Sequence, residues 1–291
     1  MPEVTVFREV DPLARVAPDA RIGPYCVVGP SVTIGPRTVL TRRVSVTGRT
    51  SIGSGNVIGE GSARGELPQD LKYAGGPTRL MIGHRNRIGA RVTIHIGTEV
   101  GGYLTRVGND NVLKDGCHVA HDCYVDDGVV LGKDVMLAGH IHVQTGAVVG
   151  ALSGVHHFVT VGRYSHVAAR TPVRRDVPPY TEFRAAPAGP PGVQGIHAEG
   201  IASASLGARE RGELIAALNE LFADEFALQT KIEQLVSLGV EGEVAEVCAF
   251  CQRSLQGVYG RHRERFRGRI PPEARQYLSP EELAKLQRTG P

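Results

Sequence analysis

The sequence predicts a left-handed parallel β-helix followed by an α-helical C-terminal domain, and three observations lead to this fold. An aliphatic residue returns at every sixth position from Val16 to Ile58, a period that fits neither an α-helix nor a simple alternating strand. Glycine is abundant, at 37 of 291 residues, while aromatic residues make up only 5% of the chain. Beyond about residue 208 the apolar spacing becomes that of helices. Hexapeptide repeats build solenoids in which each coil packs on its neighbours.

The first block of repeats keeps a single phase over eight consecutive positions, which makes a chance pattern untenable. Its aliphatic residues are Val16, Ile22, Val28, Ile34, Leu40, Val46, Ile52 and Ile58. We expect three hexapeptides to close one triangular coil with these side chains inside. Glycine follows several of them, as in Ile22-Gly23, and we expect it to free the backbone at the corners.

Two loops interrupt the repeats. The first covers residues 61–79 and contains Gln69-Asp70-Leu71-Lys72-Tyr73-Ala74-Gly75; the second covers residues 97–106. The repeats then run from Val107 to Val173, so the solenoid covers roughly residues 13–178. We assign residues 1–180 to the β-helix domain. Loops that leave a regular scaffold commonly carry binding groups.

The remainder of the chain divides into a linker and a helical domain. Residues 181–207 are rich in proline, glycine and alanine and predict an extended linker. Residues 208–291 form the helical domain, with apolar residues at helical spacing over 209–238, 244–258 and 280–287, the last capped by Ser279. An Arg-rich block at 261–269 is expected to be a solvated helix end.

Composition excludes several classes of protein. The net charge of +3 is too small to create the strong positive potential that attracts a nucleic acid. No apolar run reaches the roughly 18 residues that a membrane-spanning helix needs. The N-terminus lacks a signal-peptide pattern. Five scattered cysteines do not form a disulfide framework, so we expect a cytoplasmic protein. Cys248-Ala-Phe-Cys251 has no second pair and is interpreted as two core residues.

The histidines fall at one corner of the predicted coil. Residues 18 apart stack on successive coils, which brings together His118, His121, His140 and His156 or His157. An isolated histidine is more often structural. Four near one edge of a narrow prism are hard to explain by packing, and an imidazole is a natural general base at neutral pH.

Several motifs resemble one family. Besides the repeats and the 69–75 loop they are Val92-Thr93-Ile94-His95, His118-Val119-Ala120-His121-Asp122-Cys123, Leu137-Ala138-Gly139-His140, Val155-His156 and Asp176-Val177-Pro178-Pro179-Tyr180. Together they resemble the UDP-N-acetylglucosamine 3-O-acyltransferases of lipid A synthesis. The resemblance implies a homotrimer that moves an R-3-hydroxyacyl chain from acyl carrier protein to the 3-hydroxyl of UDP-N-acetylglucosamine. It implies no cofactor beyond the phosphopantetheine of the carrier, and no metal.

The resemblance also implies residue roles. His121 matches the general base, Asp122 orients its imidazole, and the amide of Gly139 matches the oxyanion donor. For Asp122 a solvated turn residue remains an equal alternative. The substrate-binding positions are Asp70, Lys72, His95, His118, His140, His156, His157, His197 and Glu199, and the positions that limit acyl-chain length are Ala168 and Ala169.

The sequence departs from the family at one place. Where the family has asparagine followed by basic residues, this chain has His197 and then Ala202, Ser203 and Ala204. The missing positive charge could be supplied by the 261–269 block. Otherwise the protein would be a diverged acyltransferase with another donor or acceptor, or a non-catalytic nucleotide-sugar-binding relative. A zinc enzyme of the γ-carbonic-anhydrase type is the other alternative, although the spacing His118-x-x-His121 does not match its three-histidine pattern.

Overall fold

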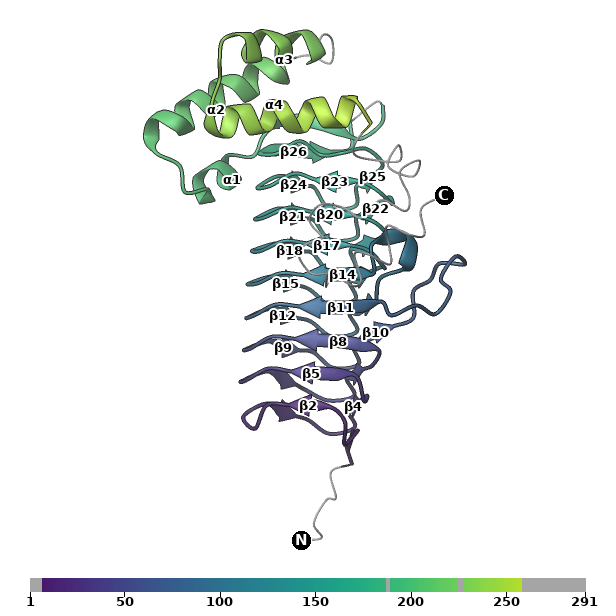
Figure 1. The fold of residues 1–291 in the computed structure, drawn as a ribbon. Helices are drawn as coiled ribbons and strands as arrows, with labels where there is room; N and C mark the ends of the chain where they lie inside the picture. Colours follow the sequence, from purple (N-terminus) through teal and green to yellow (C-terminus); the bar gives the residue numbers. More distant parts are fainter. Residues whose placement is uncertain (1–6, 187–188, 224–227, 258–291) are drawn as a thin grey trace.

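The chain winds into a tall prism of three parallel β-sheets with helices at one end (Figure 1). The computed structural model describes residues 7–186, 189–223 and 228–257. Each face of the prism is one sheet of very short strands, and each coil contributes one strand to every face. This arrangement is that of a left-handed parallel β-helix, as the repeats predict.

The first sheet carries the strands that matter most below. It consists of β1 (Glu9–Val10), β4 (Val27–Val28), β7 (Ser45–Val46), β10 (Ala63–Glu66), β13 (Thr93–His95), β16 (His118–Val119), β19 (Met136–Leu137), β22 (Gly154–Val155) and β25 (Pro172–Val173). The second sheet consists of β2 (Arg15–Val16), β5 (Val32–Ile34), β8 (Arg49–Ile52), β11 (Arg79–Ile82), β14 (Leu104–Val107), β17 (Tyr124–Val125), β20 (His142–Val143) and β23 (Thr160–Val161).

The third sheet runs to the end of the solenoid. It consists of β3 (Arg21–Ile22), β6 (Val39–Leu40), β9 (Val57–Ile58), β12 (Arg87–Ile88), β15 (Val112–Leu113), β18 (Val130–Leu131), β21 (Val148–Val149), β24 (His166–Val167), β26 (Thr181–Arg184) and β27 (Gly192–Ile196). In the uninterrupted part the register follows the predicted stacking: His118 pairs with Met136, and Met136 with Gly154.

The repeat glycines have a different cause from the one expected. Gly23, Gly35 and Gly59 are not in the left-handed region of backbone space; Tyr25 and Arg37, three residues after the aliphatic position, are among those that occupy it. A Cβ at Gly23 would instead overlap a carbonyl oxygen of the next coil. These glycines are therefore required by close stacking of coils, not by the corner conformation.

The stretch 181–207 is not the extended linker that its composition predicts. Thr181–Arg184 forms β26, which pairs in parallel with β24 and so adds to the solenoid. β27 pairs antiparallel with β26, and the short helix α1 (Ala198–Ser203) follows. Phe183 is buried in the column of aliphatic side chains. The solenoid therefore extends beyond the expected boundary at residue 180.

The helical region contains α2 (Ala208–Leu221), α3 (Leu228–Ser237) and α4 (Gly242–Leu255). The helix expected over 209–238 corresponds to α2 and α3, which are separate elements. Cys248 and Cys251 are buried in the helical core, as expected. The helix expected at 280–287 with its cap Ser279, and the basic block 261–269, lie outside the described residues.

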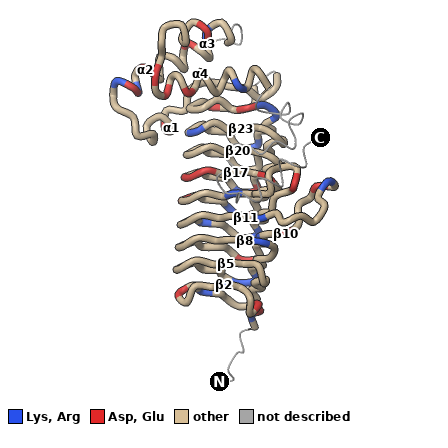
Figure 2. The backbone as a smooth tube through the Cα atoms, viewed as in Figure 1, with Lys and Arg blue, Asp and Glu red and all other residues tan. Residues whose placement is uncertain are grey.

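Polar contacts fasten the helices to the last coil. The Tyr180 hydroxyl donates to Glu243 on α4 at 2.7 Å, and Arg163 forms an ion pair with the same carboxylate at 2.8 Å. The Ser254 hydroxyl donates to Asp176 at 2.7 Å. None of the helices in the described ranges is long and apolar enough to cross a membrane. Charged residues are spread along the prism, with both signs on the loop between β10 and β11 (Figure 2).

Candidate active site

His121 and Asp122 form a buried pair at the turn between β16 and β17. His121 Nδ1 lies 2.8 Å from Asp122 Oδ2, and the two residues are 8% and 2% exposed. A carboxylate can only accept, so Nδ1 carries the proton and donates it to Asp122. The lone pair is then on Nε2, the nitrogen available to take a proton from a ligand. Asp122 is not the solvated turn residue of the alternative interpretation.

The loop over residues 97–106 holds Asp122 in place. The Thr98 amide donates to Asp122 Oδ1 at 2.8 Å, and the Thr98 hydroxyl donates to Oδ2 at 2.6 Å. The Asp122 amide donates to the Thr105 hydroxyl at 2.8 Å. Gly101 packs so closely that a Cβ there would collide with the carboxylate. Four contacts thus fix the group that orients His121.

Gly139 lies directly against the imidazole of His121, on the next coil. A side chain at this position would meet the ring, so only glycine fits. Within the described part of the chain its amide donates no hydrogen bond, which leaves it available to an oxyanion. His140 follows and meets the His121 ring edge-on, with centroids 5.2 Å apart.

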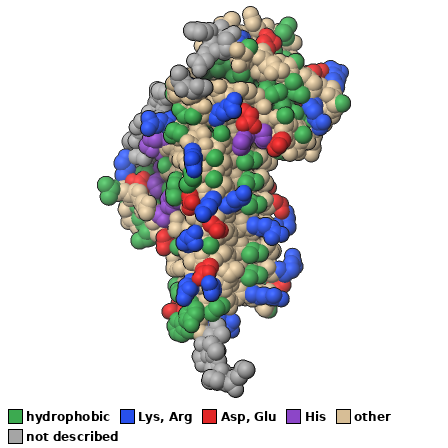
Figure 3. Space-filling view, turned by 180° about the vertical axis from the view of Figure 1, so that it is seen from behind, with side chains coloured by type: hydrophobic (Ala, Val, Ile, Leu, Met, Phe, Trp, Pro, Cys, Tyr) green, Lys and Arg blue, Asp and Glu red, His purple; other side chains and the backbone are tan. Residues whose placement is uncertain are grey.

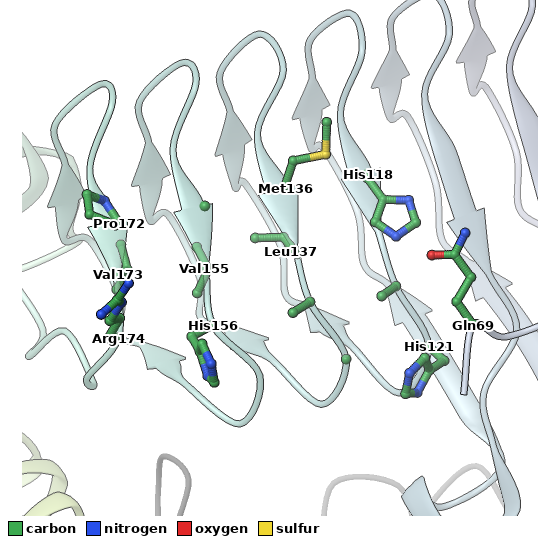
Figure 4. Close-up of a pocket in the computed structure, with 14 residues that line it drawn as sticks. Gln69, His118, His121, Met136, Leu137, Val155, His156, Pro172, Val173 and Arg174 are labelled. Atoms are coloured by element: carbon green, nitrogen blue, oxygen red, sulfur yellow. The ribbon is translucent and has the colours of Figure 1, made fainter. Parts of the chain in front are cut away.

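A groove of about 490 Å³ runs from this pair along the first sheet (Figure 4). It crosses β16, β19, β22 and β25, so it follows four coils that rise about 4.8 Å each. Its lining is mostly apolar beyond His121: Met136, Leu137, Ala138, Gly139, Gly154, Val155, Pro172 and Val173. His118, Gln69, His156 and Arg174 add polar groups. The groove can hold an apolar chain whose reactive end lies at His121.

Two neighbouring imidazoles stay neutral at pH 7. Burial, together with the nearby His95 and His121, lowers the pKa of His118 to about 4. Burial also lowers the pKa of His95. His118 Nδ1 is hydrogen-bonded to the Thr93 hydroxyl at 2.6 Å, and its ring meets that of His95 edge-on at 4.9 Å. These rings supply neutral hydrogen-bonding groups beside the base.

The loop between β10 and β11 brings Asp70 to the site. Asp70 offers a carboxylate oxygen within 4.8 Å of ligand nitrogens of His121 and His140. Its Oδ2 is buried and makes no hydrogen bond within the described residues, so it can accept one from a ligand hydroxyl. Oδ1 accepts from the Lys72 amide at 2.9 Å. Two imidazoles and a carboxylate are not the three-histidine set of the γ-carbonic-anhydrase alternative.

Other predicted site residues lie outside the groove of this chain. Ala168 and Ala169 follow β24, at the turn toward β25, and do not line it. His157 also lies outside, although its ring is 4.0 Å from that of His156. His197 and Glu199 lie at the start of α1, with His197 buried against the third sheet. Their substrate contacts remain predictions.

The substituted positions after His197 differ in their surroundings. Ala202 and Ser203 are exposed on α1, and the Ser203 hydroxyl donates back to the Glu199 carbonyl at 2.8 Å. Ala204 is 4% exposed and packs in the helical core. A basic residue at position 204 would have to displace that packing, so its absence has a structural reason in this chain.

Sequence reasoning did not assign Gln69, Thr98, Met136 or Arg174. Gln69 stands in the recognised loop motif, next to Asp70, and could have been found there. Met136 and Arg174 could have been found by adding 18 to His118 and to His156, because those positions stack on the same face. Thr98 gave no signal, since the path of an irregular loop does not follow the six-residue period.

The chain is a prism of hexapeptide coils with an oriented His–Asp pair at the end of an apolar groove. These features are those of the hexapeptide-repeat acyltransferases. No family model matches the chain. An acyl-[acyl-carrier-protein]–UDP-N-acetylglucosamine O-acyltransferase of Herminiimonas arsenicoxydans is 34% identical over 196 residues, which cover 67% of this chain and 75% of that protein. The enzyme of the same description from Paracoccus denitrificans is 49% identical over 116 residues, covering 40% and 44%.

Solved structures agree with these relatives. LpxA from Acinetobacter baumannii matches with a TM-score of 0.76 and 34% identity, over 87% of this chain and 96% of that one. The UDP-N-acetylglucosamine O-acyltransferase of Moraxella catarrhalis matches with a TM-score of 0.78 and 35% identity, over 84% and 95%. The chain therefore belongs to the acyl-[acyl-carrier-protein]–UDP-N-acetylglucosamine O-acyltransferase family.

Proposed function

We propose that the protein transfers an R-3-hydroxyacyl chain from acyl carrier protein to the 3-hydroxyl of UDP-N-acetylglucosamine, the first step of lipid A synthesis. The observation that carries this proposal is the His121–Asp122 pair. His121 lines a groove that is mostly apolar, and an Asp70 carboxylate oxygen lies within 4.8 Å of one of its ring nitrogens. An acyl chain and a sugar hydroxyl can therefore meet at one base.

The chemistry follows from the tautomer of His121. Nε2 takes the proton of the sugar hydroxyl as the oxygen attacks the thioester carbon. The carbonyl oxygen becomes an oxyanion, to which the Gly139 amide donates. When the intermediate collapses, the carbon–sulfur bond breaks and the imidazolium returns its proton to the leaving thiolate. Asp122 stabilises the imidazolium in between, because it accepts from Nδ1 throughout.

Asp70 and Lys72 are assigned to the nucleotide sugar. The unsatisfied Oδ2 of Asp70 suits a sugar hydroxyl, and the exposed Lys72 suits a phosphate. His95, His118 and His140 are assigned to the sugar, although only His118 of these lines the groove, and His156 is assigned to the base of the nucleotide. A 3-amino sugar would fit the same geometry. Assays with both acceptors distinguish them, and activity with the amine alone would replace the hydroxyl in this proposal.

The length of the acyl chain is assigned to the coil that carries Ala168 and Ala169. Ala168 and Ala169 do not line the groove of their own chain, so this assignment requires them to bound the groove of a neighbouring chain in a trimer. Alanine would shorten that groove relative to glycine, and we therefore expect a preference for medium chains. Product profiling with carrier proteins of graded chain length tests this, and Ala169→Gly should shift the preference to longer chains. A wild-type preference for long chains would overturn the assignment.

A homotrimer would complete the site. Glu199 is exposed and His157 is half-buried, and both lie outside the groove of their own chain, so each is available to a neighbour's groove. His197 is buried against Tyr164 and Glu182 and is not. A second groove of about 370 Å³ on the third sheet, beside Val57, Ile88 and Leu113, offers an apolar contact face. Sedimentation equilibrium tests this assembly; a monomer at micromolar concentration would contradict it. The reaction belongs in the cytoplasm, which suits the free cysteines.

The decisive experiment compares the wild type with His121→Ala in an assay with hydroxyacyl carrier protein and UDP-N-acetylglucosamine. Loss of the base should lower kcat by about two to four orders of magnitude. His84→Ala, at an exposed position on another turn, is the control and should keep wild-type activity. Equal rates for His121→Ala would remove it from the role of base. An inactive wild type that still binds UDP-N-acetylglucosamine would favour the non-catalytic alternative.

A further inference from the structure

A second cluster of histidines lies away from the groove, where the last coil meets α1. His166 on β24 and Glu182 on β26 share a contact of 2.8 Å between Nδ1 and Oε2. His197, immediately before α1, places Nε2 3.9 Å from Glu182 Oε1. One ligand atom from each of the three residues lies within 4.8 Å of the others. Figure 3 shows histidine side chains next to acidic ones on the surface below the helices.

The tautomer of His197 is fixed by the backbone. Its Nδ1 lies 2.7 Å from the carbonyl oxygen of Tyr164. A carbonyl can only accept, so Nδ1 carries the proton and Nε2 presents its lone pair toward Glu182. Histidine ligands of metal ions are commonly oriented in this way, with the second ring nitrogen donating to a backbone carbonyl. Gly200 also packs against the His197 ring and the Tyr164 carbonyl, where a Cβ would collide.

The spacing of the three groups suits a small tetrahedral ion. Ligands held about 2.1 Å from Zn²⁺ in a tetrahedral arrangement lie about 3.4 Å from one another. The contact of 2.8 Å joins His166 Nδ1 to Glu182 Oε2, and the contact of 3.9 Å joins His197 Nε2 to Glu182 Oε1. The ligand atoms of the three residues lie within 4.8 Å of one another, so side-chain rotations would have to bring them about 1 Å closer. His197 is nearly buried, whereas His166 and Glu182 are about one third exposed, which leaves an open side for a water ligand.

We propose that His166, Glu182 and His197 bind a divalent transition-metal ion of the zinc class, which fastens α1 to the last coil of the solenoid. Two imidazoles and a carboxylate with a water as fourth ligand form a donor set that Zn²⁺ accepts. The ion would replace the proton shared by His166 and Glu182. It would add a side-chain link among β24, β26 and the residue before α1, segments whose backbones already pair His166 with Glu182 and bond the His197 amide to the Tyr180 carbonyl. This site lies outside the groove of its own chain, and it assigns His197 to a metal ion in place of the substrate contact that the family resemblance implies.

The test uses the full-length protein after chelation and dialysis. Isothermal titration with ZnCl₂ measures stoichiometry and affinity, and Co²⁺ in place of zinc reports tetrahedral coordination by its visible absorption. His166→Asn and His197→Asn remove one ligand each; His166 is partly exposed, so its replacement should leave the fold intact. His84→Asn is the control at an exposed position. His140→Asn tests the other metal-like cluster, which contains Asp70, His121 and His140.

We expect one zinc ion per chain at this site and a higher Tm with zinc. Each ligand variant should weaken binding by about 100-fold or more and abolish both the cobalt absorption and the rise in Tm. His84→Asn and His140→Asn should keep the zinc affinity, the cobalt absorption and the rise in Tm of the wild type. The proposal is overturned if the wild type shows no saturable zinc binding or if His166→Asn binds zinc as the wild type does. It is also overturned if His140→Asn is the only variant that loses zinc binding.

Discussion

Gly139 and His121 are in contact across two successive coils: a Cβ atom on Gly139 would stand 2.5 Å from Cε1 and 2.8 Å from Nε2 of the imidazole. The imidazole of His121 therefore packs directly on the backbone of Gly139, whose amide lies close to the ring.

Gly139→Ala should displace the His121 ring and the oxyanion donor together. We expect kcat to fall by about 10²- to 10³-fold, the usual effect of losing one such donor, with the fold unchanged by circular dichroism. Gly212→Ala is the matched control, because a Cβ at Gly212 meets nothing within 4 Å. Wild-type kcat in Gly139→Ala would show that the contact is irrelevant to catalysis.

Thr98→Val should destabilise the protein through Asp122. The substitution keeps the shape of the side chain but removes the hydroxyl that donates to a buried carboxylate at 2.6 Å. We expect a loss of about 1–3 kcal/mol in the free energy of unfolding, measured by urea denaturation. Thr33→Val, on an exposed strand position, should change it by less than about 0.5 kcal/mol. Equal effects of the two substitutions would contradict the role of Thr98.

Stability should depend on pH through His118. Burial lowers its pKa in the folded protein from 6.5 to about 4, so between these values the unfolded chain binds a proton that the folded protein does not. The folded state therefore loses stability as pH falls from about 6.5 toward 4. In His118→Asn, urea midpoints should fall less steeply over this range, whereas His84→Asn should follow the wild type. Parallel curves for the wild type and His118→Asn would refute the assignment.

Glu243→Ala should loosen the attachment of the helices to the solenoid. The carboxylate accepts a hydrogen bond from the buried Tyr180 hydroxyl and forms an ion pair with Arg163. Burial raises the pKa of Tyr180, and the contact with Glu243 raises it as well. Leaving the hydroxyl unpaired should cost about 1–3 kcal/mol of unfolding free energy. Glu246→Ala provides the comparison, because Glu246 is 60% exposed and reaches Arg163 only at 4.0 Å. A larger effect from Glu246 would refute the attachment.

The solenoid and the histidine corner could be predicted from the sequence for one physical reason. Each hexapeptide points one aliphatic side chain inward, so the period fixes the phase, and stacking every 18 residues then places His121 beside Gly139 and His140. The pair His121–Asp122 is also local, since the two residues are neighbours in the chain. These relationships need only the period of the backbone.

Relationships that depend on irregular segments could not be predicted. Thr98 reaches Asp122 across 24 residues through a loop whose path the period does not determine. The composition of residues 181–207 suggested a linker, because proline and glycine lie around its centre, yet Phe183 completes the column of core residues. Because this stretch was expected to be a linker, the contacts of Glu182 with His166 and His197 were not predicted.

The two ends of the solenoid differ in a way that affects how molecules meet. A stack of parallel strands with an open edge invites another chain to continue it. At the upper end β27 runs antiparallel to β26, and the helices lie beyond them (Figure 1). At the lower end the second and third sheets begin with the exposed Arg15 and Arg21, whose charges disfavour pairing. End-to-end polymerisation into filaments is thus opposed by geometry at one end and by charge at the other.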